Sequence, residues 1–312
     1  MRSNRGCGTA LKISAIICTH NRYDLLPKAI ESLIDQTIDK TLYEIIVVDN
    51  ASTDDTIKVC EQYSSQQNMR YIYEPAVGLS EARNRGAKEA CGKYVAYMDD
   101  DAIASRGWLE KILFAFEEVS PLPVSVGGKI NPIWEVPNPS WLPDYKKPYL
   151  TILDYGDTPT FLKHPQILYG TNMAFEKEVL LRFGGFRTDI GRKKRKLLGG
   201  EDMEIFMKLS EDSLPVYYMP EASVSHLVPK ERLTKEWLYS RHYWQGRSEV
   251  LLVSERLQKG DVFHEIRKAF AMIFKHSKEL YRSKREDDQF SHSAIIRQQI
   301  GRLVQLMVLL KE

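Results

Sequence analysis

Apolar runs alternate with helix-like segments along the first third of this 312-residue chain, and this alternation constrains the fold more than any other feature. An apolar run of strand length followed by a segment with helical spacing is the pattern of a parallel sheet flanked by helices. The sequence predicts strands at residues 13–18, 44–48, 71–73 and 94–98, and helices at 25–36, 54–64, 80–90 and 107–119. Asp24 is predicted to cap the first of these helices. The expected fold class is α/β with a mostly parallel central sheet.

The pattern changes after Pro121. Residues 131–149 are rich in proline, tryptophan and tyrosine and are predicted to form a shaped surface loop. Further strands are predicted at 124–130, 168–175, 216–219 and 224–228, and further helices at 177–183, 201–209, 234–252, 262–282 and 294–310. We therefore expect one domain over residues 1–255, with halves at about 12–120 and 121–255, and a helical C-terminal extension over 256–312.

Composition limits the possible partners. The hydrophobic content of 43% suits a sizeable core. Lys+Arg is 44 and Asp+Glu is 42, so the net charge of +2 indicates no nucleic-acid partner.

Cysteine usage and hydropathy bear on location. Cys7, Cys18, Cys60 and Cys91 have no paired spacing, which predicts reduced thiols and a cytoplasmic protein. No apolar run approaches the ~20 residues that span a bilayer, so any membrane association is expected to be peripheral, at the inner face of the cytoplasmic membrane.

Three consecutive aspartates, Asp99, Asp100 and Asp101, end the apolar run 94–98. Carboxylates this close repel and raise one another's pKa unless a cation intervenes, and Mg²⁺ and Mn²⁺ prefer oxygen ligands. The alternative is a solvated acidic turn that opens the next helix.

Polar residues also follow the other predicted strands. In open parallel sheets, ligands gather beyond the carboxyl ends of the strands. That rule groups the aspartate triplet with residues that follow the first two strands: Thr19, Asn21, Arg22, Asp49 and Asn50.

Six segments in order resemble the family 2 glycosyltransferases, which have the nucleotide-sugar-binding GT-A fold. They are residues 16–22, 46–54, 78–84, 98–101, 170–175 and 199–202. The resemblance implies that residues 12–120 hold the nucleotide and that 121–255 form the acceptor side. Residues 170–175 resemble the acceptor-side strand of that family, where small residues and amide groups admit a sugar.

The resemblance implies a donor site for a nucleotide-diphosphate sugar, with UDP as the expected nucleotide. Asp49 is the expected acceptor for a base imide N–H, a role that an ionised carboxylate suits; the alternative is a helix or turn cap. The other donor-binding residues that the resemblance implies are Thr19, Asn21, Arg22, Arg83, Asn84, Asp99 and Asp100.

The resemblance also implies a divalent ion, Mn²⁺ or Mg²⁺. Asp99 and Asp101 match the carboxylates that the family uses, with Asp101 the expected direct ligand. His226 is similar in position to a histidine that adds a ligand in some members, although a structural strand histidine is the alternative.

Asp202 is the expected catalytic base, because the acidic pair of the family stands here as Glu201 and Asp202 at a helix start. It would take a proton from the acceptor hydroxyl as that oxygen attacks the anomeric carbon with inversion. Glu201 is expected to orient or bind the acceptor, and N-terminal capping is the alternative for both.

Two basic features stay open. The run 192–196 is either a solvated loop or a segment that closes over an anionic substrate. In the C-terminal helices, apolar residues at helical spacing with basic neighbours fit packing on the main domain, a homodimer or peripheral membrane attachment.

The sequence therefore predicts a metal-dependent inverting glycosyltransferase that moves a sugar, most simply from a UDP-sugar, to a hydroxyl of a glycan or lipid-linked acceptor. The alternatives are a nucleotidyltransferase and a noncatalytic protein that binds sugar nucleotides or glycans.

Overall fold

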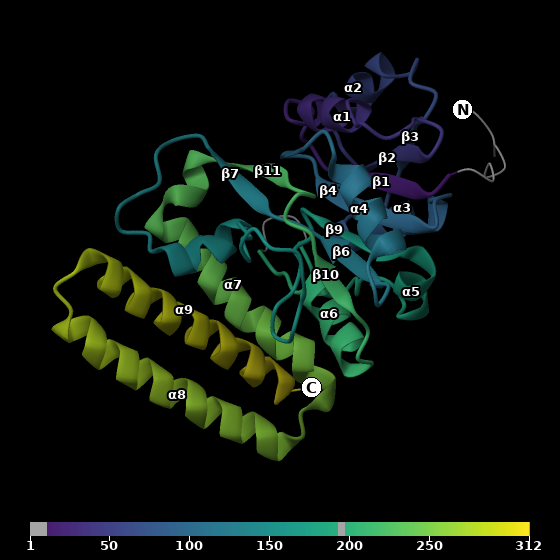
Figure 1. Ribbon diagram of the computed structural model, residues 1–312. Helices are drawn as coiled ribbons and strands as arrows, with labels where there is room; N and C mark the ends of the chain where they lie inside the picture. The colour runs from purple at the N-terminus through teal and green to yellow at the C-terminus, as the bar shows by residue number, and fades with distance from the viewer. Residues whose placement is uncertain (1–10, 193–196, 312) are drawn as a thin grey trace. The chain divides into compact units, whose positions relative to one another are not determined.

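The computed structural model describes residues 11–192 and 197–311, and the larger of its two sheets has eight strands (Figure 1). The first four strands are β1 (Ile13–Thr19), β2 (Tyr43–Asp49), β3 (Met69–Tyr73) and β4 (Tyr94–Asp99). They lie in the order β3-β2-β1-β4 and all pair in parallel. The helices between and after them are α1 (Leu26–Ile34), α2 (Thr56–Gln62), α3 (Leu79–Glu89) and α4 (Trp108–Glu118). The predicted α/β class is confirmed.

Burial of their apolar side chains stabilises these strands and helices. β2 is buried at every position, as expected for a central strand covered on both faces. Gly86 lets α3 lie close to β1, because a Cβ on residue 86 would stand 2.6 Å from Ile16 Cγ2. The aromatic rings of Tyr94 and Phe116 stack with centroids 4.2 Å apart and so fix α4 on β4.

The second half of the sheet is mixed. It contains β6 (Ser125–Gly127), β8 (Thr160–Phe161), β9 (Met173–Glu176) and β10 (Val216–Tyr218). β9 lies between β4 and β6 and runs antiparallel to both. The strand predicted at 168–175 therefore forms only from Met173 onward, and residues 168–172 are a loop at the edge where β4 ends.

A separate three-stranded sheet has the order β5-β11-β7. Its strands are β5 (Ala102–Ala104), β7 (Ile130–Trp134) and β11 (Val224–Val228). β11 matches its predicted bounds, whereas β5 and β7 are too short or too polar to have been predicted as separate strands. Two helices, α5 (Lys177–Arg182) and α6 (Glu201–Glu211), complete this part.

The cysteines only partly match the expectation of reduced thiols. Cys18 and Cys60 are free. Cys91 is disulfide-bonded, so the expectation is wrong for that residue. Cys7 lies outside the described residues.

The chain divides into two compact units. The first comprises the described residues up to 133 together with 151–188 and 202–227; the second comprises the described residues within 134–150, 189–201 and 228–312. The domain boundary predicted at residues 255 and 256 stays a prediction.

The second unit is built on three helices, α7 (Lys235–Val253), α8 (Lys259–Arg282) and α9 (Glu286–Leu309), with short 3-10 turns η1 (Asp144–Leu150), η2 (Lys230–Leu233) and η3 (Ser254–Arg256). α9 packs on both other helices and lies between them (Figure 1). Val250, Val262 and Leu306, one from each helix, form a shared apolar cluster.

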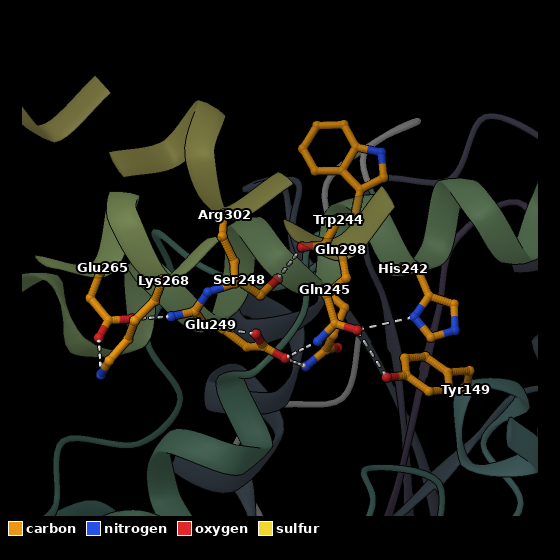
Figure 2. A network of polar contacts seen from close by, with 10 residues as sticks. All are labelled: Tyr149, His242, Trp244, Gln245, Ser248, Glu249, Glu265, Lys268, Gln298 and Arg302. Atoms are coloured by element: carbon orange, nitrogen blue, oxygen red, sulfur yellow. Dashed lines mark hydrogen bonds and ion pairs between the residues drawn. The ribbon is translucent and has the colours of Figure 1, made fainter. Parts of the chain in front are cut away.

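A polar network joins the three helices of this unit (Figure 2). Arg302 of α9 binds Glu249 of α7 at 3.0 Å and Glu265 of α8 at 2.6 Å. Gln298 of α9 donates to Glu249 and accepts from Tyr149, at 2.6 and 3.3 Å.

Within the part of the chain that the structure describes, no helix is long and apolar enough to cross a membrane.

Candidate active site

The predicted grouping of residues at one sheet edge is present. Thr19, Asp49 and Asp99 are the last residues of β1, β2 and β4. In the β1–β2 register Thr19 lies opposite Asp49, and in the β1–β4 register Cys18 lies opposite Asp99. Three strands therefore deliver polar side chains to neighbouring positions.

Asp49 is held in place by groups of the protein. Its side chain is buried, and its two carboxylate oxygens accept hydrogen bonds from the Tyr71 hydroxyl at 2.7 Å and the Ser52 N–H at 2.9 Å. Burial, reinforced by this hydrogen bond, raises the pKa of Tyr71, so its hydroxyl stays a donor. Each carboxylate oxygen keeps a second lone pair for another donor.

Two predicted donor-binding residues bind the backbone of neighbouring loops. Asn21 has a φ of 53°, and its side-chain oxygen accepts from the Thr53 N–H at 2.7 Å. The Asn84 amide donates to the Phe186 carbonyl and accepts from the Phe186 N–H, both at 2.8 Å. These contacts order the loops around the sheet edge.

Asp99, Asp101 and His226 form a cluster in which one ligand atom from each lies within 4.8 Å of the others. The chain enters β5 directly after Asp101, and β5 pairs with β11, so that His226 stands opposite Ala102. His226 Nε2 lies 3.4 Å from Asp101 Oδ1, and the Leu227 N–H donates to the Asp101 carbonyl at 2.9 Å.

This donor set fits a divalent ion. Two carboxylates supply the oxygen ligands that Mg²⁺ and Mn²⁺ prefer, and a neutral imidazole is a common metal ligand that can add a nitrogen to them. The structure therefore brings together all three residues that the sequence predicted to hold a metal.

Each of the two acidic residues also has an arginine beside it. Arg22 Nη1 lies 3.4 Å from Asp101 Oδ2, and Arg83 Nη2 lies 3.6 Å from Asp99 Oδ1. The Arg83 side chain is only 4% exposed, whereas that of Arg22 is 36% exposed. Both guanidinium groups are thus positioned next to the cluster, and Arg83 is the more rigidly held.

Asp100 differs from its two neighbours. It is buried, and burial together with the charge of Asp101 raises the pKa of its carboxyl above the usual range. It is not part of the three-residue cluster.

The sequence did not single out the pair Gly170 and Thr171 as contacts of the acidic residues. The Thr171 hydroxyl donates to Asp99 Oδ2. The Gly170 N–H donates to Asp202 Oδ2 at 3.4 Å. Because these donors belong to consecutive residues, Asp202 lies close to the cluster at the end of β4.

Asn172 does not serve the role that was predicted for amide groups in this segment. It is fully buried, its side-chain oxygen accepts from Trp108 Nε1, and its nitrogen donates to the Ala222 carbonyl, both at 2.8 Å. A side chain so enclosed packs the core and does not admit a sugar, so that expectation is wrong for Asn172.

The acidic pair stands at the start of α6 as predicted. Asp202 is half-buried, and its Oδ1 accepts from the Met203 N–H at 2.8 Å. Glu201 is buried. Gly200, with a φ of 106°, adopts a backbone conformation that favours glycine just before the helix.

The basic run 192–196 lies largely outside the described residues. Arg192 is described and exposed, and 193–196 are not described.

The fold and this sheet-edge site define a class of nucleotide-sugar transferases, those with the GT-A fold. The sequence model of glycosyl transferase family 2 matches residues 14–182, more than half of the chain. This chain belongs to that family.

The relatives have diverse substrates. The chain is 28% identical over 246 residues to a glucosyl-dolichyl phosphate glucuronosyltransferase of Haloferax volcanii, covering 78% of this chain and 77% of the relative. It spans about half the length, or less, of several other curated relatives that it matches.

Solved structures show the same fold. A mannosyltransferase from Pyrobaculum calidifontis in complex with GDP-Man and Mn²⁺ aligns with a TM-score of 0.63 and 18% identity, over 94% of this chain and 87% of that one. The TarS protein of S. aureus in complex with UDP aligns with a TM-score of 0.56 and 15% identity, over 97% and 92%.

Proposed function

We propose that this protein is a metal-dependent, inverting glycosyltransferase that moves a sugar from a nucleotide-diphosphate donor to a hydroxyl of a glycan or lipid-linked acceptor. One observation carries the proposal. The Gly170 N–H donates a hydrogen bond to Asp202, and the hydroxyl of the next residue, Thr171, donates one to Asp99. The candidate base Asp202 therefore lies beside the candidate metal site.

The donor would bind at the carboxyl edge of β1, β2 and β4. Asp99, Asp101 and His226 would hold Mn²⁺ or Mg²⁺, which would stabilise the negative charge on the departing diphosphate. Arg22 and Arg83 now face carboxylates and would also face phosphate oxygens there, since a guanidinium can fork across either group.

Asp202 would take the proton from the acceptor hydroxyl. The N–H groups of Gly170 and Met203 donate to its two carboxylate oxygens and orient the carboxylate at the first turn of α6. The hydroxyl oxygen would attack the anomeric carbon on the side opposite the nucleotide, so a single displacement inverts that centre.

The choice of a UDP-sugar rests on Asp49, which retains acceptor capacity for a base imide N–H. The structural neighbours include complexes with UDP and with GDP-Man, and the latter also contains Mn²⁺. A lipid-linked acceptor is supported by the name of the Haloferax relative, a glucosyl-dolichyl phosphate glucuronosyltransferase. Cytoplasmic location remains part of this proposal.

The test is calorimetric titration of the protein with UDP, with and without Mn²⁺. We expect Mn²⁺ to raise the affinity of the wild type for UDP. In Asp101→Ala the affinity for UDP in the presence of Mn²⁺ should be lower than that of the wild type by at least about 10-fold. The matched control is Asp157→Ala, which removes an exposed carboxylate from a loop. Equal Mn²⁺-dependent binding by Asp101→Ala would refute coordination there.

A second assay separates the reaction classes. Metal-dependent hydrolysis or transfer from UDP-, GDP- and dTDP-sugars would support the proposal. Release of pyrophosphate from a nucleoside triphosphate would identify a nucleotidyltransferase instead, and nucleotide binding without transfer or hydrolysis across donor and acceptor panels would identify a noncatalytic binder.

A further inference from the structure

Four aromatic side chains on α8 are exposed to solvent. Phe263, Phe270, Phe274 and Tyr281 have exposed fractions of 55%, 60%, 63% and 94%. Their spacings of 7, 4 and 7 residues place them within about 40° of one another around the helix. We call this set the α8 aromatic stripe.

The stripe is not the packing face of α8. Val262, Ala269 and His276 are buried, and α8 packs against α9. These buried positions lie about 100° or more around the helix from the stripe. The apolar content of α8 is thus divided between one face that serves the fold and another that has no partner among the described residues.

Basic side chains flank the stripe. Arg267, Lys275, Lys278 and Arg282 are exposed, and Lys278 Nζ lies 4.3 Å from the centroid of the Phe274 ring. Within the part of the chain that the structure describes, no carboxylate pairs with Arg267, Lys275 or Lys278. Their positive charge is therefore available to a partner.

The acidic residues of α8 are kept away from the stripe. Asp261, Glu265 and Glu279 each lie about 160° around the helix from it. Glu265 binds Arg302 at 2.6 Å and Lys268 at 2.9 Å inside the network of Figure 2, and Asp261 accepts from the Gln258 N–H at 3.0 Å. The face of α8 that carries the stripe consequently combines aromatic rings with cations, because Asp261, Glu265 and Glu279 lie on the opposite side of the helix.

We propose that the α8 aromatic stripe docks on an anionic lipid surface, with the helix lying in the plane of the interface. Aromatic rings enter the headgroup boundary while lysine and arginine bind acidic headgroups, which is the arrangement of amphipathic interfacial helices. This inference goes beyond the proposed transferase activity and does not rest on it.

A second copy of the chain is the less suitable occupant. Pairing two stripes face to face would bring Arg267, Lys275 and Lys278 of both copies together, and like charges across an interface oppose association. An anionic membrane has the complementary charge.

The test is sedimentation of the full chain with vesicles of phosphatidylcholine and phosphatidylglycerol (7:3), compared with phosphatidylcholine alone. We expect binding to the anionic vesicles at 10 mM salt and a strong decrease at 150 mM, because the screening length falls from about 30 to about 8 Å. Wild-type protein that stays in the supernatant with anionic vesicles at low salt would overturn the proposal.

Two variants assign the binding to α8. Phe270→Ser with Phe274→Ser should lower the partition coefficient at least about 10-fold. Arg267→Gln with Lys275→Gln and Lys278→Gln should lower it about 100-fold at low salt. All five side chains are exposed, so circular dichroism should show an unchanged fold.

Two control variants carry the same kinds of substitution elsewhere, with one phenylalanine replaced in the first and three lysines in the second. Phe114→Ser removes an aromatic ring of α4 that is 53% exposed, and Lys40→Gln with Lys88→Gln and Lys163→Gln removes three exposed charges. We expect these variants to bind nearly as the wild type. Equal binding by the stripe variants and the wild type would overturn the proposal, as would a dimer by light scattering that the stripe variants convert to monomer.

Discussion

The guanidinium group of Arg83 occupies the space that a side chain on Gly170 would need. A Cβ on residue 170 would overlap Arg83 Nη2, and the Arg83 side chain is only 4% exposed. The arginine has little room to move aside, so this contact fixes the segment before β9 against α3 and keeps the guanidinium beside Asp99.

We therefore expect Gly170→Ala to lower the free energy of unfolding by about 1–3 kcal/mol, as overpacking of a closed site does. Urea denaturation measures this. Gly260→Ala is the control, because no atom lies within 4 Å of its added Cβ. In an Arg83→Ala background the cost of Gly170→Ala should largely disappear, since the two residues are in contact. An undiminished cost there would contradict the steric explanation.

Thr171→Val tests the contribution of the Thr171 hydroxyl, because valine has nearly the same shape as threonine and lacks the hydroxyl. Thr171 is fully buried and its hydroxyl donates to Asp99, so valine leaves that carboxylate without one donor. We expect a loss of about 1–3 kcal/mol in stability and weaker Mn²⁺-dependent UDP binding by calorimetry. Thr171→Ser keeps the hydroxyl and should retain most of the binding. If serine and valine behave alike, the hydrogen bond does not position Asp99.

Asp202→Asn should abolish most transfer while keeping the fold. The asparagine oxygen can still accept from the Met203 N–H, but the amide cannot take a proton, so kcat/KM should fall about 10²- to 10⁴-fold. Initial rates with a donor and acceptor found by screening give the value. Asp212→Asn, an exposed substitution just after the same helix, is the control. Activity close to that of the wild type would exclude Asp202 as the base.

Acid should destabilise the protein through His242. Burial, followed by the charge of Lys146, lowers the pKa of His242 to about 3 in the folded state. The unfolded chain binds a proton near pH 6.5, so between pH 6.5 and 3 it holds more protons than the folded chain and stability falls as pH falls. This group alone should remove about 2 kcal/mol of stability between pH 7.5 and 5.

Urea denaturation at the two pH values tests this. His242→Gln should show a pH dependence smaller by about that amount, whereas His264→Gln, which replaces an exposed histidine of the same unit, should behave as the wild type. Identical pH dependence in His242→Gln and the wild type would show that another group is responsible.

The parallel part of the sheet was predicted closely because buried strands are continuous apolar runs between polar turns. β1 and β4 begin at the predicted residues and extend by one residue past the predicted ends. Local capping was harder to predict: Asp24 does not cap α1, which begins after Leu25 without a side-chain cap. The strand β9 was predicted to begin too early, because the loop 168–172 contains the apolar Leu168, which is buried without being in a strand.

Sequence predicted those candidate site residues whose proposed role can be inferred from neighbouring residues in the chain. Asp99 ends β4 and Asp101 follows it by two residues, a position that the apolar run before the three aspartates shows directly. The contacts of Gly170 and Thr171 depend on the antiparallel pairing of β9 with β4, which brings residues some 70 positions apart together. A pairing of this kind leaves no local pattern.

The helices of the second unit show the same limit. Helical spacing predicted α8, but it did not distinguish buried Val262 from exposed Phe270 and Phe274. That distinction depends on where α9 packs.

The position of α9 has a consequence for synthesis of the chain. α9 follows α7 and α8 in sequence, yet it is the layer on which both of them pack. During translation α7 and α8 emerge with their apolar faces uncovered and remain so until α9 has left the ribosome. Assembly of these helices must therefore wait until α9 has been synthesised, and a premature stop before Glu286 would leave Val250 and Val262 without the Leu306 that completes their cluster.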